Sequence, residues 1–356
     1  MKGVTGSSQR MGARWRTSLE HGFVRPSIVT CLTAMQHAPR QEWTMLLNTV
    51  LPATREIANF IELRQRARPL GPKRVAVVSA DDEVALTAAD GALQLGIAVP
   101  VLVGNERKIR SKAEALGLSK LIAKAEFIDA DDAATVATHM AGRGDVDLLL
   151  KGHIRTDELL RAALDRTAGL RTGRLLSDVL LYEDKLAGER RLVGITDGGL
   201  NVAPDLEQKK QIIQNAIEVM RSLGLARPKI ALMSATETVS ESVPSTVDAR
   251  KLTEISEAGQ FGDAEVFGPL ALDCALLESA ARAKGIEHPV AGHADCMVVP
   301  NIEAGNLLGK SVKYLGGSQC AHVVVGAKVP ILIPSRVESV DDKVNSIALG
   351  VIFATR

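Results

Sequence analysis

The pair Ser335-Arg336 joins a hydroxyl and a guanidinium at a turn that the sequence predicts between an apolar strand and a helix beginning near Ser339. The planar guanidinium of arginine binds phosphate or carboxylate through two parallel hydrogen bonds, and the amides of a helix N-terminus add further donors. The turn is therefore a candidate anion site. In the alternative interpretation, Ser339 only caps the helix, and Asp341 and Asp342 favour its dipole.

A second turn, Lys151-Gly-His-Ile-Arg-Thr156, leaves another apolar strand through Gly152 and enters a helix. Arg155 and Arg161 lie off the apolar stripe of that helix, where ordinary solvated charge explains them as well as ligand binding does. His153 beside the strand end is more often a hydrogen-bonded structural residue than a catalytic base.

Two further turns combine polar groups with glycines. One is Thr196-Asp-Gly-Gly-Leu-Asn201, and the other is the segment 301–310, in which Asn301, Glu303, Gly305 and Asn306 open a helix after a strand. Glycines let a backbone or a ligand approach closely. Since ligands of parallel α/β sheets collect at the carboxyl ends of strands, we expect these turns to carry the chemistry.

Several common sites are missing from the sequence. There is no GxGxxG, Walker A or GxSxG pattern, so nucleotide and serine hydrolysis lose their main support. His288, His293 and His322 form no HxxxH or HxH spacing, and we expect no metal site. The four cysteines are too far apart for a CxxC pair, which favours reduced thiols in the cytoplasm.

The elements that must position these turns alternate along the chain, which is typical of α/β proteins with a mainly parallel sheet. The expected strands are 74–79, 99–103, 146–150, 179–182, 192–196, 229–233, 296–299, 321–325 and 331–333. The expected helices are 84–95, 105–116, 131–141, 156–167, 206–223, 248–259, 270–284, 303–315 and 340–354.

Composition limits the class of protein. The 356 residues are enough for two domains. No apolar stretch is long enough to span a membrane. Because only 3% of the residues are aromatic, the chain has few side chains on which nucleic-acid bases could stack. Of 43 basic and 42 acidic residues, six basic and two acidic ones lie in 1–44, which leaves 37 basic and 40 acidic. We interpret 1–44 as a disordered or non-native leader, with an organelle transit peptide as the alternative.

Taken together, the turns resemble the phosphate acetyltransferase and phosphate butyryltransferase family from about Val75 onward. The stretches that carry the resemblance are KGHIRTDELLRAAL (151–164), GLRTGRLLSDV (169–179), TDGGLNVAPDLEQK (196–209), GPLALD (268–273), NIEAGNLLGKS (301–311), VVVGAKVPILIPSR (323–336) and VNSIAL (344–349). They occur in the family's order.

The resemblance implies two Rossmann-like three-layer α/β domains with an active-site cleft between them. Domain I would comprise 45–168 plus 322–356, and domain II would comprise 169–321. It also implies a homodimer and a reversible reaction, in which acyl-CoA and phosphate give acyl phosphate and coenzyme A (CoA). CoA is a substrate here, and no cofactor or metal is expected.

The resemblance also implies residue roles. Asp342 would accept the proton of the CoA thiol, because the thiolate is the nucleophile, and Ser335 would donate a hydrogen bond to the developing oxyanion. Arg336 and Arg161 would hold the phosphoryl group. The motif residues expected to bind substrate are Lys151, Gly152, Asn301, Glu303, Gly305 and Asn306. An ordinary carboxylate is a weak base toward a thiol, so Asp342 should need an environment that raises its proton affinity.

The chain departs from the acetyl-specific pattern at several places. It lacks a segment with another phosphate-site arginine before Lys151, which places it closer to the short butyryltransferase branch. Phe267, His293 and His322 stand where relatives usually have aspartate or small or apolar residues. These departures motivate one alternative, a CoA- or acyl-phosphate-binding protein without turnover. A second alternative is a metal-dependent NAD dehydrogenase of the related isocitrate and isopropylmalate dehydrogenase fold.

Overall fold

The computed structural model describes residues 56–186 and 191–355, and residues from Glu56 onward form one compact unit. Its strands are β1 (Lys73–Val78), β2 (Ala98–Gly104), β3 (Glu126–Asp129), β4 (Leu148–Lys151), β5 (Ser177–Asp184), β6 (Arg191–Thr196), β7 (Lys229–Met233), β8 (Glu265–Leu270), β9 (Cys296–Val298), β10 (Cys320–Val325) and β11 (Ile331–Leu332).

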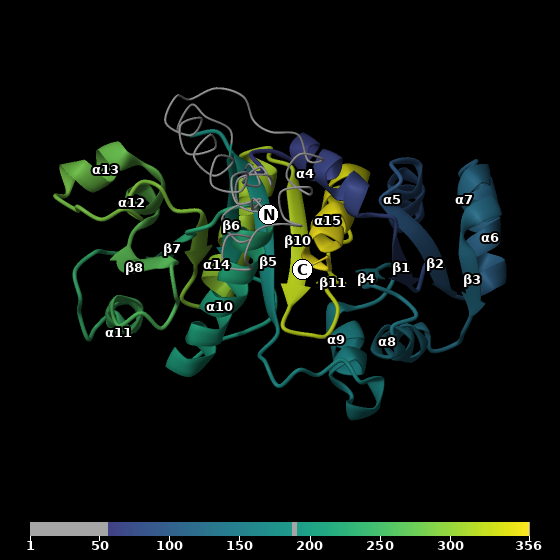
Figure 1. The fold of residues 1–356 in the computed structure, drawn as a ribbon, viewed down its shortest axis with the longest axis horizontal. Helices are drawn as coiled ribbons and strands as arrows, with labels where there is room; N and C mark the ends of the chain where they lie inside the picture. The colour runs from purple at the N-terminus through teal and green to yellow at the C-terminus, as the bar shows by residue number, and fades with distance from the viewer. Residues whose placement is uncertain (1–55, 187–190, 356) are drawn as a thin grey trace, which may run out of the picture. The chain divides into compact units, whose positions relative to one another are not determined.

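Helices precede or follow most of these strands (Figure 1). They are α4 (Phe60–Ala67), α5 (Glu83–Gln94), α6 (Glu106–Ala115), α7 (Ser119–Lys124), α8 (Ala133–Arg143), α9 (Thr156–Leu164), α10 (Leu206–Ser222), α11 (Pro244–Glu257), α12 (Leu272–Leu276), α13 (Glu278–Ala283), α14 (Ile302–Lys310) and α15 (Val340–Phe353). Shorter turns are η1 (Arg68–Leu70), η2 (Arg166–Ala168) and the π-helical η3 (Ser311–Leu315).

The strands form one sheet in the order β3-β2-β1-β4-β11-β10-β5-β6-β9-β7-β8. Seven neighbouring pairs are parallel, which confirms the prediction of a mainly parallel α/β fold. The three antiparallel pairs are consecutive: β11 with β10, β10 with β5, and β5 with β6. The direction of the strands therefore reverses only in the middle of the sheet.

Helices cover both faces of the sheet because its strands are apolar on both sides. In β4, Leu148 and Leu150 pack into the cluster that contains α5 and α15 residues, whereas Leu149 packs into the cluster that contains α8 and α9 residues. Figure 1 shows α5 and α15 on one side of β1 and β4, and α8 and α9 on the other. A third cluster joins β5, β6 and β9 to α12.

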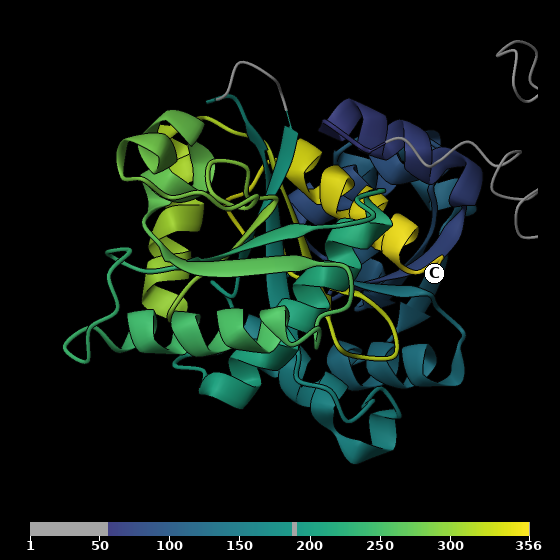
Figure 2. The same cartoon turned by 60° about the vertical axis from the view of Figure 1, so that its left-hand side comes forward.

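Helix α15 ties the middle of the sheet to the first elements of the described chain. It packs against α4, α5 and β10, and Figure 2 shows it in yellow between the green half of the molecule and the purple helices. Eleven of its fourteen residues are buried. The helix is therefore enclosed nearly all round, and its buried residues include the polar Asp342, Lys343, Asn345 and Ser346 of its first turns.

The structure corrects several predicted elements. Strands β3 and β8 were not predicted, because β3 is short and partly exposed, and Gly268-Pro269 in β8 is typical of a turn. Both are edge strands that pair on one side only, where proline is tolerated. The predicted helix 270–284 is divided into α12 and α13, and α14 ends at Lys310, before η3.

Two predictions concern features that the structure does not decide. The leader 1–44, which includes one of the four cysteines, Cys31, lies outside the described residues. The domain boundaries, 45–168 plus 322–356 and 169–321, remain a prediction, because a single sheet runs through both predicted domains. No helix within 56–186 or 191–355 is long and apolar enough to cross a membrane.

Candidate active site

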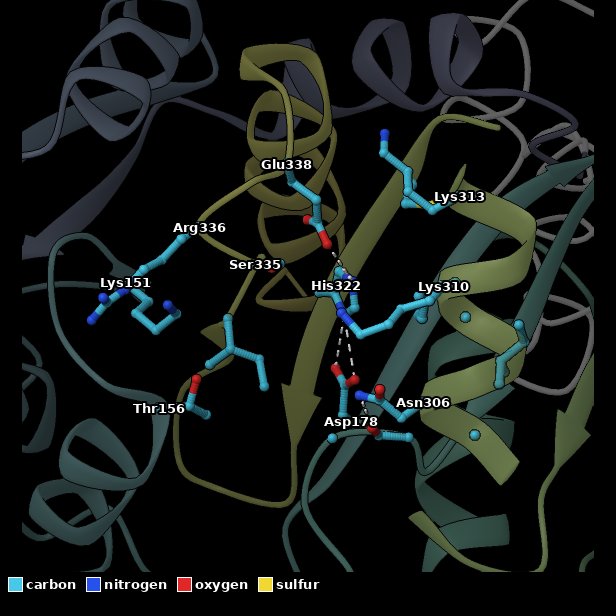
Figure 3. A pocket seen from close by; sticks show the side chains of 18 of the residues that line it. Lys151, Thr156, Asp178, Asn306, Lys310, Lys313, His322, Ser335, Arg336 and Glu338 are labelled. Atoms are coloured by element: carbon cyan, nitrogen blue, oxygen red, sulfur yellow. Dashed lines mark hydrogen bonds and ion pairs between the residues drawn. The ribbon is translucent and has the colours of Figure 1, made fainter. Parts of the chain in front are cut away.

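A cavity of about 530 Å³ opens where the strand direction reverses. Its walls come from the turn after β4, from β5, from the Gly198-Gly199 turn after β6, from α14 and η3, from β10, and from the segment 333–338 before α15. Figure 3 shows Lys151, Thr156 and Arg336 on one side of His322, and Asn306, Lys310 and Lys313 on the other. Elements from both halves of the sheet therefore build one site.

The cavity contains more positive than negative side chains. Five lysine and arginine side chains line it, against the carboxylates of Asp157, Asp178 and Glu338; these cations are Lys151, Arg155, Lys310, Lys313 and Arg336. Arg155 is paired with Asp157 at 2.9 Å, and Lys313 is paired with the buried Asp342. Among the described residues, the other three cations have no carboxylate within 4 Å. They are Lys151, Lys310 and Arg336.

Lys151 interacts electrostatically with two further cations, Lys343 and Arg336, beside Ser335. Lys151 is 5% exposed, and its Nζ donates to the carbonyl of Ile154 at 3.4 Å, while Lys343 Nζ donates to the carbonyl of Ser335 at 3.4 Å. Burial, with the neighbouring charges of Lys343 and Arg336, lowers the pKa of Lys151 to about 8. An anion bound here would relieve the repulsion among the three cations.

His322 lies between two carboxylates at the floor of the cavity. Its Nδ1 is 3.3 Å from Oδ2 of Asp178 on β5, and its Nε2 is 3.2 Å from Oε1 of Glu338 (Figure 3). Burial alone would lower the pKa of His322, but the charges of Asp178 and Glu338 outweigh it and raise the pKa to about 10. The ring is therefore an imidazolium at neutral pH.

Two polar atoms of this contact are left without hydrogen bonds. His322 Nε2 and Glu338 Oε2 are buried, and neither has a hydrogen-bond partner among the described residues. The 3.2 Å contact between Nε2 and Oε1 is an ion pair without hydrogen-bond alignment. A buried donor and a buried acceptor are therefore left without hydrogen-bond partners among the described residues.

Asp342 lies outside the cavity lining, although the sequence predicted it as the catalytic base. It is fully buried and accepts hydrogen bonds from Lys313 Nζ, from Ser339 Oγ at 2.6 Å and N at 3.0 Å, and from Cys320 N at 2.8 Å. Burial would raise its pKa, but the hydrogen bonds from Lys313, Ser339 and Cys320 together lower it. This is opposite to the direction that the predicted role requires.

The turn after β6 is held by a buried carboxylate. Asp197 accepts from the amides of Gly199 and Leu200, each at 2.8 Å, and burial together with nearby Asp178 raises its pKa to about 6. Helix α14 packs directly on this turn, since a Cβ added at Gly305 would lie 2.6 Å from the Cα of Gly198. Only glycine permits this approach of two backbones.

The predicted substrate-binding residues of α14 divide into two groups. Gly305 and Asn306 line the cavity, and Asn306 Nδ2 donates to the carbonyl of Gly198 at 3.4 Å. Asn301 instead caps α14 by accepting from Ala304 N at 3.0 Å, and Glu303 is exposed outside the cavity lining. Asn301 therefore sets where the helix begins.

Of the other residues predicted to form the site, some line this cavity and others lie outside it. Lys151, Ser335 and Arg336 line the cavity together. Gly152 lies outside its lining, where a Cβ would meet the carbonyl oxygen of Ser79 at 2.4 Å. Arg161 lines a different cavity of about 450 Å³ beside α8, and its side chain is 77% exposed.

Sequence reasoning missed several residues of the site. Asp178 and Lys310 belong to stretches that carry the family resemblance, but nothing in their spacing marked them as lining one cavity. Glu338 was not singled out, and His322 was considered only as a metal ligand and as a departure from the family pattern. Asp178 and His322 are 144 residues apart in sequence, so only the pairing of β5 with β10 brings them together.

One group of metal-ligand side chains occurs elsewhere in the described part of the chain. Oxygen and sulfur atoms of Glu237, Asp273 and Cys274 lie within 4.8 Å of one another. The ammonium of Lys284 already contacts Glu237 at 2.9 Å and Asp273 at 3.3 Å. A lysine thus supplies the positive charge there, and none of these residues lines the cavity.

The chemistry of the cavity follows from its walls. The three cations without carboxylate partners provide sites for anionic groups, and the apolar side chains of Leu180, Ile195 and Ile333 provide a surface for a small apolar group. The site can hold a ligand that carries phosphate groups beside a small apolar group.

Comparison with known proteins identifies relatives over most of the chain. The family model described as phosphate acetyl/butaryl transferase matches residues 119–351. A phosphate acetyltransferase of Rhizobium meliloti is 40% identical over 304 residues, which cover 84% of this chain and 94% of the relative. A phosphate butyryltransferase of Clostridium beijerinckii is 37% identical over 84% of this chain and 98% of the relative.

A solved structure agrees with these relatives. The branched-chain phosphotransacylase of Enterococcus faecalis superimposes with a TM-score of 0.70 at 29% sequence identity, over 79% of this chain and 99% of that one.

The contact between Gly198 and Gly305 generates a prediction. Gly305→Ala should push α14 away from the turn after β6, because the added methyl group has no space, and should cost about 1–3 kcal/mol of unfolding free energy. Chemical denaturation measures this, with Lys251→Ala on the exposed face of α11 as the control. Equal stability of both variants and the parent chain would contradict the described packing.

Proposed function

Because the chain belongs to the phosphate acetyl/butaryl transferase family, and is thus a phosphate acyltransferase, we propose that its cavity binds acyl-CoA and phosphate together. The reaction converts acyl-CoA and phosphate to acyl phosphate and CoA, in either direction, with a short acyl group such as acetyl or butyryl. One observation carries the assignment of the site. Three cations without carboxylate partners face one cavity, as two anionic substrates require.

We assign phosphate to the side of the cavity formed by Lys151, Ser335 and Arg336. Lys151 is buried in the cavity wall, and the guanidinium of Arg336 is exposed at the opening. A phosphate between them could therefore bind to both side chains. Phosphate oxygens accept the charge-assisted hydrogen bonds that these donors supply. Arg161 was expected to share this role, but it faces the second cavity, and we assign its part to Lys151.

The acyl-CoA would approach from the other side of His322. Lys310 is the free cation there, and Asn306 is an amide that can bond to the polar groups of CoA. Leu180 and Ile195 are apolar surfaces for the acyl chain, and each buried methylene contributes about 0.8 kcal/mol. Binding both substrates in one cavity makes the transfer local and needs no covalent enzyme intermediate.

We propose a positioning role for Asp342 in place of the predicted proton acceptor. Its hydrogen bonds to Ser339 cap α15, and its ion pair fixes Lys313 at the cavity wall.

We further propose that CoA enters as a substrate and that no separate cofactor or metal takes part. Neither alternative function is favoured by the relatives, which are phosphate acyltransferases along most of this chain.

A direct assay tests the activity. Purified chain incubated with acetyl-CoA or butyryl-CoA and phosphate, without metal or nicotinamide, should consume the thioester and release free CoA. The loss of thioester absorbance measures the rate. Binding of CoA without turnover of any short acyl-CoA would instead favour the binding protein without catalysis.

The lowered pKa of Lys151 predicts a pH dependence of phosphate binding. Below its pKa of about 8 the ammonium is present and attracts phosphate, and above it the charge is lost, so KM for phosphate should rise above that pH. Lys151→Met should raise KM about tenfold at neutral pH and remove this dependence.

Two further variants test whether the pH dependence of KM for phosphate comes from Lys151. Arg336→Ala should weaken phosphate saturation at every pH, because a guanidinium keeps its charge throughout. The exposed Lys251 on α11 gives the matched control, and Lys251→Met should leave the profile unchanged. A rise in KM above pH 8 that survives in Lys151→Met would assign the titration to another group.

We propose a homodimer, as expected from the family. The continuous helix of α14 and η3 exposes Leu307 and Leu315 at 68% and 88%, and apolar surface of this kind is often covered by a partner chain. Light scattering should give twice the mass of one chain, and a monomeric mass at assay concentration would contradict the proposal.

We also propose a cytoplasmic location, which the three free cysteines of the described part support.

A further inference from the structure

We propose that the nucleotide end of CoA binds along one row of side chains on α14 and η3, with its adenine ring on Tyr314 and its phosphate groups at Lys310. The inference rests on the proposed function of the cavity, and it assigns the direction in which CoA lies there. Three residues carry it. Asn306, Lys310 and Tyr314 all line the cavity, and all three are exposed.

The three residues form one row because they follow each other at intervals of four. Residues four apart lie on the same side of a helix, and each such step advances about 6 Å. The π-helical η3 continues α14 without a break, and the ammonium of Lys310 is 6.0 Å from the ring centre of Tyr314. An amide, an ammonium and an aromatic ring therefore follow one another along one wall of the cavity.

The order of these side chains matches the order of the chemical groups in CoA. CoA begins with an adenine ring, continues through phosphate groups, and ends in an arm that carries two amides and the thiol. A base stacks on an aromatic ring, phosphate binds an ammonium, and an amide bonds to a carboxamide. The adenine therefore lies at η3, and the arm passes Asn306 beside the turn of Gly198 and Gly199, which lines the same cavity.

Tyr314 has the exposure that stacking requires. It is 53% exposed, whereas Tyr182, the other tyrosine, is buried in the core. Among the described residues that line the cavity, Tyr314 is the only tyrosine, phenylalanine or tryptophan. A base that stacks in this cavity therefore has one platform, and a single substitution removes it.

Lys310 is better suited to phosphate than Lys313, the other lysine of this wall. Lys313 is 18% exposed and pairs with the buried Asp342. Lys310 is exposed, and in the part of the chain that the structure describes no carboxylate lies within 4 Å of its ammonium. A phosphate group can therefore bind Lys310 through charge-assisted hydrogen bonds without breaking an ion pair.

Asn306 holds the third position of the row. Its Nδ2 donates to the carbonyl of Gly198 at 3.4 Å, so the side chain is tied to the turn after β6. No donor within the described residues reaches its Oδ1. That oxygen is therefore left for an amide N–H of the CoA arm.

The test compares two thioesters that differ only in the nucleotide, acetyl-CoA and acetyl-pantetheine. Tyr314→Ala should raise KM for acetyl-CoA about tenfold, because stacking is lost, and should leave KM for acetyl-pantetheine unchanged. Tyr314→Phe should keep the parent KM for both thioesters, since the ring and not the hydroxyl stacks on the base. Val239→Ala gives the control, because Val239 is exposed and lies outside the cavity lining.

The same pair of thioesters tests the phosphate contact. Lys310→Met should raise KM for acetyl-CoA about tenfold and leave KM for acetyl-pantetheine unchanged. The increase of KM for acetyl-CoA with salt should also become smaller, because a screened charge has been removed. Lys251→Met, on the exposed face of α11, is the matched control.

A measurement on the parent chain covers variants that fold poorly. Adenosine 3′,5′-bisphosphate carries the base and phosphate groups of CoA without the arm. At saturating phosphate it should inhibit competitively against acetyl-CoA and should leave KM for acetyl-pantetheine unchanged, because the nucleotide and the arm occupy different parts of the row. Equal competition against acetyl-pantetheine would place the nucleotide in the path of the arm and would overturn the inference.

The outcomes separate this inference from the proposed function. If the parent chain turns over no short acyl-CoA, the proposed function fails. If it turns over acetyl-CoA, and KM for acetyl-CoA is unchanged in both Tyr314→Ala and Lys310→Met, only this inference fails. Equal losses with both thioesters, or a monomeric mass of Tyr314→Ala in light scattering, would give the ring a structural role and would also overturn it.

Discussion

The contact of His322 with Asp178 and Glu338 is the interaction on which the site depends. It links β5, β10 and the segment before α15 at the place where the strand direction reverses. Burying two carboxylates is costly unless a cation compensates them, and the imidazolium does so for both. The same ring therefore holds the two halves of the cavity in register and gives its floor a defined charge.

The position of that ring explains how a nearly neutral chain binds anions. Some charges elsewhere on the surface are paired, as Arg250 with Glu254 and Arg282 with Glu278 illustrate. In the cavity, the available carboxylates are already engaged with His322 or Arg155, and cations such as Lys151 and Lys310 are left over. Affinity for phosphate groups thus arises from local pairing, and net charge gives no indication of it.

The sequence predicts the fold class, most strands, and the turn residues Lys151, Ser335, Arg336 and Gly305, because these depend on local patterns. It does not predict Asp178 beside His322, since their contact depends on which strands are neighbours. It also could not reveal that Asp342 is enclosed by four donors, because a capping aspartate and a free one look alike in a motif. Long-range strand order and buried hydrogen bonding are the information that was lacking.

The sheet order has a consequence for biosynthesis. Strand β4 pairs on one side with β1, which is made before it, and on the other with β11, which leaves the ribosome only after residues 152–330. Helix α15, which covers β10 and contacts α4 and α5, follows later still. During translation, strands β1 to β4 are therefore complete before β11 can pair with the free edge of β4 and before α15 can cover its apolar face. An open strand edge and an exposed apolar face are prone to aggregation. A chaperone that shields this face during translation would act on the intermediate that the topology imposes.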